Sequence, residues 1–500
     1  MKLYKRLLCL TISMLMLLCF VGCQGDPEAA ESEAAQSVTV NGTPTVFLTT
    51  PNTYVKFQQQ SGDAVKVYSV NSLDRSTGMV IDVDASKTGQ AVDGWGCAMT
   101  ETSALNLSKM PAEMYTQVMN DLFSEDQGIG LNILRLPMGI SDFSLDPNRS
   151  YVDDNDETLE SFSIAYDEEY IIPHIHKAME VADCGEDFMV FAASWTAPLW
   201  MKTIPEFHSK NQSTLKREYY GLFAKYLAKA VKAYEEAGVP IDYLTAQNEP
   251  TGIHGIAAMY MDSDNMASLI NMYLAPALEA EGLDTKIMAW DFNYTDGSTV
   301  ILGKTHGTVG GIAYHVYGGD FQVLVDTHNA FPDVPLYITE AAGKVGSNSA
   351  IFFRQMKNMC KTLRAGSKGH ILWNIVLDEN MGPALIDEDG NSVNTIGIGL
   401  MEYNTQTQEV AYLMDFYALG HFSKFIRPGA VLLESTDIAT DSNENLHNVV
   451  FRNENGTITA VVYNNSGEEV TFKIVVGDKV IEYTIPGLSG ATITWDGNVY

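Results

Sequence analysis

The segment that decides how this chain is interpreted is YLTAQNEP, residues 243–250. It begins as an apolar run typical of a buried β-strand, and it then ends on an amide, a carboxylate and a proline. A strand in a protein core has no structural use for Asn248 and Glu249 at its exit. The segment therefore predicts a buried strand whose last residues carry chemistry.

Strands of this kind recur along the chain and alternate with helices. The strand segments, in order, are residues 92–99, 133–138, 188–195, 243–250, 286–293, 310–318, 335–342 and 369–376. Several are continuous apolar runs, which are typical of parallel strands covered by helices. Of the helical patterns between them, one begins after Pro111, and two others end at Gly238 and Gly282.

Eight strand-plus-helix units predict the α/β class, and specifically a (β/α)₈ barrel, in which catalytic residues lie at strand C-termini. A doubly wound sheet is the competing topology, but no GxGxxG follows any strand. Short strands and turn residues at both chain ends predict one side β-sandwich built from the two ends. The expected division is a signal peptide at 1–23, an acidic linker at 24–36, sandwich strands at 37–85, the barrel at 86–428 and the remaining sandwich at 429–500.

The N-terminus has the pattern of an export signal. Lys2, Lys5 and Arg6 precede a short apolar run, and Cys23 follows Val21-Gly22. This ending resembles a bacterial lipoprotein signal, in which the cysteine is lipidated, and ordinary cleavage nearby is the alternative. We expect an exported protein, either a cell-surface or outer-membrane lipoprotein of a bacterium or a secreted one.

Composition limits the possible partners. The chain has 31 basic and 63 acidic residues and a net charge of −32, so it repels nucleic acid, anionic membranes and polyanionic sugars. A neutral substrate is favoured, with membrane contact only through the lipid anchor. Cys97, Cys184 and Cys360 are too widely spaced for a disulfide framework, and we expect them in the core. No motif indicates a metal or a cofactor, and the oligomeric state stays open.

A second carboxylate matches Glu249. Glu340 ends the seventh strand as Glu249 ends the fourth, so both are expected to enter one pocket from opposite sides. Two carboxylates about 5 Å apart perform glycoside hydrolysis with retention, one as nucleophile and one as acid/base. A single glutamate at a strand end is usually a solvated loop residue, but two at matching positions favour catalysis.

Residues near these carboxylates suggest their roles. Arg135 lies inside the second strand, where a buried cation requires a partner, and near Glu340 it would keep that nucleophile ionised. A purely structural ion pair is the alternative. Glu249 must be protonated when the sugar arrives, which requires surroundings that raise its pKa. Asn248 is placed to donate a hydrogen bond to the sugar 2-hydroxyl.

Five further residues are candidates for substrate contacts. His315 and Tyr317 share one face of the sixth strand, and we expect them to support the nucleophile unless the histidine is a core residue. Trp195 and Trp373 close the third and eighth strands, where indoles form sugar platforms or, alternatively, core. Asp142 follows the second strand and would accept sugar hydroxyl hydrogen bonds or cap a helix.

Together these motifs resemble glycoside hydrolase family 30, which includes glucosylceramidases and microbial β-1,6-glucanases. The resemblance extends from about residue 80 to residue 430 and rests on GWGCAMTETSALNL (94–107), ILRLPMGISDFS (133–144), AASWTAPLWMK (192–202), QNEP (247–250), YHVYGGD (314–320), LYITEA (336–341) and GHFSKFIRPG (420–429). It implies a clan A barrel with a side sandwich and a retaining mechanism, in which Glu249 is the acid/base and Glu340 the nucleophile. The sugar-binding positions it implies are Arg135, Asp142, Trp195, Asn248, Tyr317 and Trp373.

The resemblance leaves the substrate open, because TGIHGIAAMYM, residues 251–261, matches neither subgroup. We expect a retaining β-glycoside hydrolase acting on β-linked glucose, in a β-1,6-glucan or a glucosylceramide-like glucoside. Another neutral β-glycoside, such as a xylan, xyloside, fucoside or galactan, is the alternative. A carbohydrate-binding lipoprotein without turnover is the rival from a different class, and it would lack a carboxylate.

Overall fold

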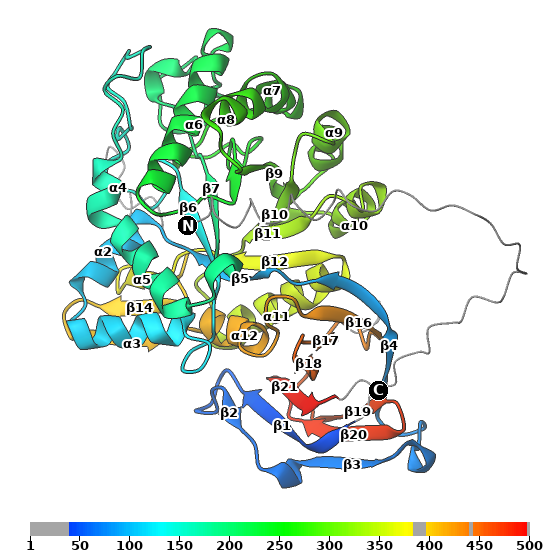
Figure 1. Cartoon of the computed structure of the whole chain (residues 1–500). Coiled ribbons are helices and arrows are strands. Elements are labelled where there is room, and N and C mark those ends of the chain that lie inside the picture. Colours follow the sequence, from blue (N-terminus) through cyan, green and yellow to red (C-terminus); the bar gives the residue numbers. More distant parts are fainter. Residues whose placement is uncertain (1–39, 384–396, 440–443, 498–500) are drawn as a thin grey trace, which may run out of the picture. The chain divides into compact units, whose positions relative to one another are not determined.

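Eight parallel strands close into a barrel in the computed structural model, which describes residues 40–383, 397–439 and 444–497 (Figure 1). In chain order the barrel strands are β5 (Gly94–Ala98), β6 (Ile133–Pro137), β7 (Met189–Ala193), β8 (Tyr243–Thr245), β9 (Lys286–Tyr294), β10 (Gly311–Gly319), β11 (Leu336–Glu340) and β12 (Ser367–Leu372). Each predicted strand segment overlaps one of them, so the predicted α/β barrel is confirmed.

Helices follow the barrel strands, and α3, α6 and α8 begin or end beside Pro111, Gly238 and Gly282, as the sequence indicates. The main ones are α2 (Glu101–Lys109), α3 (Ala112–Phe123), α4 (Ala165–Tyr170), α5 (Ile172–Ala182), α6 (Tyr220–Glu236), α7 (Ser263–Leu269), α8 (Ala275–Glu281), α9 (Gly297–Thr305), α10 (Phe321–Ala330), α11 (Asn348–Arg364) and α12 (Met414–Ser423). The side chains of Thr100 and Ser347 accept hydrogen bonds from backbone N–H groups in the first turns of α2 and α11, respectively. Gly282 ends α8 in the left-handed conformation, with φ of +72°.

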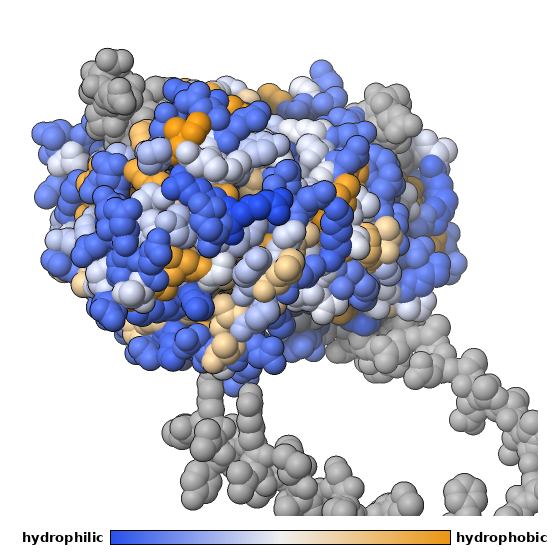
Figure 2. Space-filling model, turned by 90° about the horizontal axis from the view of Figure 1, so that it is seen from above, coloured by the Kyte–Doolittle hydropathy of each residue, from blue (hydrophilic) through white to orange (hydrophobic). Residues whose placement is uncertain are grey.

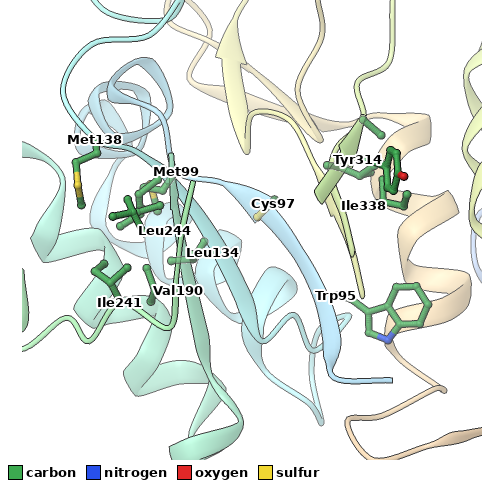
Figure 3. Packing of buried hydrophobic residues seen from close by; sticks show 14 of the residues in the cluster. Trp95, Cys97, Met99, Leu134, Met138, Val190, Ile241, Leu244, Tyr314 and Ile338 are labelled. Carbon is green, nitrogen blue, oxygen red and sulfur yellow. The ribbon is translucent and has the colours of Figure 1, made fainter. Parts of the chain in front are cut away.

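Alternation along the barrel strands separates two apolar layers. On β6, Leu134 belongs to the large cluster between strands and helices, whereas Ile133 belongs to a small cluster inside the barrel. Figure 3 shows part of the outer cluster, including Trp95, Cys97 and Leu134. Because side chains alternate between faces, Arg135 returns to the inside, one step above Ile133 toward the strand C-termini. The inner apolar cluster thus lies below a layer of polar side chains around Arg135, which we call the polar layer.

The two chain ends share a second sheet of ten strands, in which the blue N-terminal strands lie beside the red C-terminal ones (Figure 1). Strands β1 (Asn41–Thr49), β3 (Val65–Ser69) and β4 (Met79–Ala91) pair with β21 (Ser489–Asp496), β20 (Lys479–Ile485) and β19 (Val470–Val476), respectively. The remaining strands are β2 (Gln58–Gln59), β16 (Val431–Ser435), β17 (Leu446–Arg452) and β18 (Thr457–Asn464). Their apolar side chains converge on one core, so the predicted side sandwich built from both ends is confirmed.

Some features were not predicted from the sequence. Strand β16 lies inside the ten-stranded sheet between β17 and β4, and β13 (Val376–Asp378), β14 (Met401–Asn404) and β15 (Glu409–Tyr412) form a small separate sheet. Cys97 and Cys360 are buried as expected, but Cys184 is only partly buried. The predicted signal peptide and linker, including Cys23, lie outside the described residues.

The surface is mainly hydrophilic where Figure 2 shows it, with small and separate hydrophobic patches. This agrees with the excess of acidic residues in the sequence. Within the described ranges, no helix combines the length and the apolar character that a membrane span requires.

Candidate active site

Glu249 lies on a sharp bend directly after β8 rather than on the strand itself. The strand ends at Thr245, and Glu249 adopts a left-handed conformation with φ of +45°. The backbone N–H of Asn248 donates to the Ser194 carbonyl at 2.7 Å, and that of Glu249 donates to the Asp291 carbonyl at 3.0 Å. The polar exit that the sequence showed is therefore fixed between the ends of β7 and β9.

Glu340 is the last residue of β11, and a β-bulge directs its side chain inward. Tyr314 pairs with Ile338, but the next residue, His315, pairs with Glu340, so β11 carries one extra residue here. As a result both Thr339 and Glu340 reach the polar layer, although consecutive strand residues normally point to opposite faces. Strands β8 and β11 are three places apart in the barrel rather than directly opposite, and the two carboxylates still meet.

Arg135 is the centre of the polar layer and is almost completely buried. Its Nη1 donates to Glu340 Oε2 at 2.5 Å, and its Nη2 donates to Asn248 Oδ1 at 2.7 Å and Asp291 Oδ2 at 3.1 Å. The predicted contact with Glu340 is present, together with a second, structural ion pair to Asp291. Because the arginine occupies Oδ1 of Asn248, the amide nitrogen of Asn248 is the group left to donate to a sugar.

Tyr317 and His315 divide their support between the two carboxylates. The Tyr317 hydroxyl donates to Glu340 Oε1 at 3.0 Å, as expected of a residue that orients the nucleophile. His315 Nδ1 instead lies 2.9 Å from Glu249 Oε1 and 3.9 Å from Glu340 Oε1. We predicted that His315 supports Glu340, and this is wrong for the hydrogen bond of His315, which is made with Glu249.

Glu249 has histidine partners on both of its oxygens. His254 Nε2 lies 2.8 Å from Oε2, opposite the contact of His315 with Oε1. Burial alone would raise the pKa of Glu249, but the contacts with His254 and His315 outweigh burial and lower the pKa to about 2. The predicted raised pKa is therefore wrong, because these two contacts keep Glu249 ionised.

The proton that this carboxylate lacks is held by its histidine neighbours. Burial would lower the pKa of His315, but the charges of Glu340, Asp291 and Glu249 outweigh it and raise that pKa to about 9. The contact with Glu249 likewise raises the pKa of His254. His315 is therefore protonated at neutral pH, and the contact with Glu249 favours the protonated form of His254.

Asp142 lies on the loop after β6 and does not cap a helix, because the next helix is α4. Burial, followed by the charges of Glu340 and Glu249, raises its pKa to about 8. Its Oδ1 is buried without a hydrogen-bond partner among the described residues. A protonated Asp142 with an unpartnered oxygen near the two carboxylates fits the predicted contact with a sugar hydroxyl.

Trp195 and Trp373 form one stacked pair, with ring centroids 5.2 Å apart. The Arg135 guanidinium lies over both rings, 4.9 Å and 5.4 Å from their centroids. The two indoles are only 2% and 5% exposed, so they hold Arg135 in place from behind. Their predicted role as sugar platforms stays a prediction.

Sequence reasoning missed Asp291, Thr339 and His254. Asp291 accepts from Thr339 Oγ1 at 2.6 Å and from Arg135, and His315 Nε2 lies 3.1 Å from it. It is the extra residue of a bulge in β9, where Trp290 and Asp291 have φ of +74° and +66°. An acidic residue in an apolar strand was the available signal, whereas nothing in the sequence marked His254.

The ligand atoms of Glu249, His315 and Glu340 lie within 4.8 Å of one another, a spacing that a metal ion could bridge. Glu340 already pairs with Arg135, and Glu249 pairs with two histidines. A further cation would have to compete with these positive groups. The donor set therefore fits acid/base chemistry better than metal binding.

Two family models match this chain and together cover most of it. The description "Glycosyl hydrolase family 30 TIM-barrel domain" matches residues 92–426, and "Glycosyl hydrolase family 30 beta sandwich domain" matches residues 429–493. The chain belongs to glycosyl hydrolase family 30. It is thus a β-glycoside hydrolase of a retaining family, as the sequence motifs predicted.

Relatives within family 30 share the whole architecture at low identity. An endo-1,6-beta-D-glucanase of Neurospora crassa is 28% identical over 84% of this chain and 86% of its own length. The lysosomal acid glucosylceramidase of Mus musculus is 29% identical over 86% of each chain. A solved endo-beta1,6-glucanase superposes with a TM-score of 0.79 at 26% identity and covers 91% of this chain and 100% of its own.

Proposed function

We propose that this family 30 enzyme hydrolyses β-linked glucosides by double displacement, with Glu340 as nucleophile and Glu249 as acid/base. The observation that carries the proposal is the approach of the two carboxylates, which bring an oxygen each within 4.8 Å. A separation near 5 Å suits a nucleophile that bonds to the sugar, whereas inverting enzymes leave roughly 6.5–9.5 Å for a water.

In the first step a Glu340 oxygen attacks the anomeric carbon, and the bond from that carbon to the leaving oxygen breaks. Glu249 gives its proton to the leaving oxygen, so the alcohol departs and a covalent glycosyl-enzyme remains. In the second step water attacks the same carbon, Glu249 accepts the water proton, and Glu340 is released as a carboxylate. Arg135 and Tyr317 stay bonded to Glu340 and fix the direction of attack.

Glucose in a β-1,6-glucan or a glucosylceramide-like glucoside is the substrate we propose. Relatives named as β-1,6-glucanases and glucosylceramidases match most of the chain, which supports a glucosyl unit. A specific feature favours an apolar aglycone as the second candidate. Leu145, Ile253 and Val345 are 47%, 49% and 61% exposed, and they lie on the loops after β6, β8 and β11 at the catalytic end of the barrel.

The test is a panel read by product release: a β-1,6-glucan, glucosylceramide in detergent, xylan, a β-1,4-galactan and aryl β-fucoside. Glu340→Gln serves as the matched control, because it keeps the side-chain shape and removes the nucleophile. We expect release from a glucosyl substrate by the wild-type protein and none by the variant. Release only from xylan, galactan or fucoside would contradict the proposed substrate, and binding without release would support the inactive lipoprotein.

A further inference from the structure

The two oxygens of Glu249 are held by different histidines, Oε1 by His315 and Oε2 by His254. His315 holds Oε1 and is itself fully buried, and Asp291 fixes its other ring nitrogen. The contact at Oε2 is the easier one to displace, because the His254 side chain is 29% exposed, and general acid catalysis requires hydrogen-bond contact between the acid and the leaving oxygen. Oε2 is the atom next to His254.

His254 is held at this oxygen by its loop and can move its ring. The histidine loop (residues 251–258) is fixed by Ser209, which accepts from the His254 N–H at 2.9 Å and donates to the Gly252 carbonyl at 2.9 Å. Buried Lys202 donates to the Ala258 carbonyl at 3.0 Å. The ring itself is 29% exposed, and its Nε2 makes no aligned hydrogen bond to any described residue despite the 2.8 Å ion-pair contact.

We propose that His254 is a positioning residue for the acid/base. It contacts Glu249 Oε2 before the leaving group arrives, transfers its proton to that oxygen as the leaving group approaches, and moves aside. The proposal rests on the proposed role of Glu249. It assigns to His254 the proton that Glu249 lacks, and it places the histidine loop on the leaving-group side of the site.

The charge balance is compatible with this transfer. The charged and titratable groups around the Glu249–His254 pair are Arg135, Asp142, Asp291, His315, Tyr317 and Glu340, with Lys210 packed against Gly255. Moving a proton from His254 to Glu249 leaves the net charge of the pair unchanged. The carboxylate thereby becomes an acid without taking a proton from solvent.

Two substitutions separate the ring from Oε2 in different ways. His254→Gln removes the titrating group. Gly252→Ala keeps both titrating groups, but its Cβ would lie 1.9 Å from His254 Nε2, and the flexible ring must swing away. His306→Gln is the matched control, because it removes a histidine that pairs with Asp333 at 2.9 Å beyond the end of α9.

The readout is kcat/KM against pH for phenyl and 2,4-dinitrophenyl β-glucosides, since only the phenyl group needs a proton to leave. Both variants should lose about 10- to 100-fold on the phenyl glucoside, a part of what acid catalysis contributes, and should stay near wild type on the dinitrophenyl glucoside. In the wild type the Glu249–His254 pair keeps its proton until the pH exceeds the pKa of His254, which the contact with Glu249 raises. In variants without the His254–Glu249 contact, kcat/KM for the phenyl glucoside should therefore begin to fall at a lower pH.

NMR titration of the histidine rings needs no turnover and checks the contact itself. The pKa of His254 should fall in Glu249→Gln and in Gly252→Ala, while His306→Gln leaves it unchanged. A basic limb at the wild-type position in both loop variants would overturn the proposal and make His315 the proton source. If Glu249→Ala itself keeps the wild-type rate on the phenyl glucoside, the proposed role of Glu249 fails instead.

Discussion

Glu340 lies at the end of β11 between Arg135 and Tyr317, whereas Glu249 lies on a bend after β8 between two histidines. An arginine does not give up its proton in a protein, so the charge beside Glu340 is permanent. Imidazoles exchange protons near neutral pH, so the charge beside Glu249 can be transferred. The comparison teaches that the group beside each carboxylate suits the role we propose for it. The permanent charge of Arg135 suits nucleophilic attack by Glu340, and the exchangeable protons of the histidines suit acid/base catalysis by Glu249.

The largest loss of activity is expected at Glu340, the carboxylate beside the permanent charge of Arg135. Glu340→Gln should lower kcat by at least about 10⁴-fold, because no covalent intermediate can form while the rest of the site persists. Steady-state kinetics with an activated aryl β-glucoside measures it, with circular dichroism to verify the fold. A variant that retains more than a small fraction of the rate would remove Glu340 from its role.

At Glu249, the carboxylate beside the two histidines, the loss of activity should depend on the leaving group. Glu249→Ala should lower kcat/KM for phenyl β-glucoside by about 10²–10⁴-fold, the usual contribution of general acid catalysis. For a dinitrophenyl glucoside the first step needs no proton, and azide should restore turnover by attacking the glycosyl-enzyme directly. Equal losses for both glucosides, without rescue by azide, would argue against an acid/base role.

Removing the permanent charge should destabilise the fold as well as the site. Arg135→Met leaves Glu340 and Asp291 buried without their cation, which typically costs about 3–5 kcal/mol of unfolding free energy. Arg75→Met breaks an exposed pair with Asp82 and should change the denaturation midpoint much less. Urea unfolding compares the two, and similar midpoints would mean that Arg135 is not the electrostatic centre described.

The smallest effect is expected at Asp142, which faces both carboxylates. Its pKa of about 8 means that the carboxyl is protonated at neutral pH and gains a negative charge above pH 8. Asp142→Asn imitates the protonated form, so kcat/KM at pH 6 should stay within about threefold, under 1 kcal/mol. Above pH 8 the variant should lose less activity than the wild type. A steeper alkaline loss in the variant would contradict the assigned protonation.

The barrel and both carboxylates were predictable from the sequence because apolar runs alternate with helices and end on Glu249 and Glu340. The two bulges were not predictable, since an extra residue in a strand leaves no periodic trace while it reverses the direction of Asp291. The contact of His254 depends on how two irregular loops are joined through Ser209. The pKa of Glu249 was predicted in the wrong direction because the two histidines that lower it lie on distant or irregular segments.

Covalent trapping tests the assignment of the two carboxylates most directly. A 2-deoxy-2-fluoro-β-glucosyl fluoride should form a glycosyl-enzyme that accumulates, because the 2-fluorine slows both steps while the good fluoride leaving group keeps the first step faster than the second. Mass spectrometry of the digested protein should then find one added fluoroglucosyl group, on the peptide that contains Glu340. A label on Glu249, or turnover of the reagent with inversion at the anomeric carbon, would contradict the account.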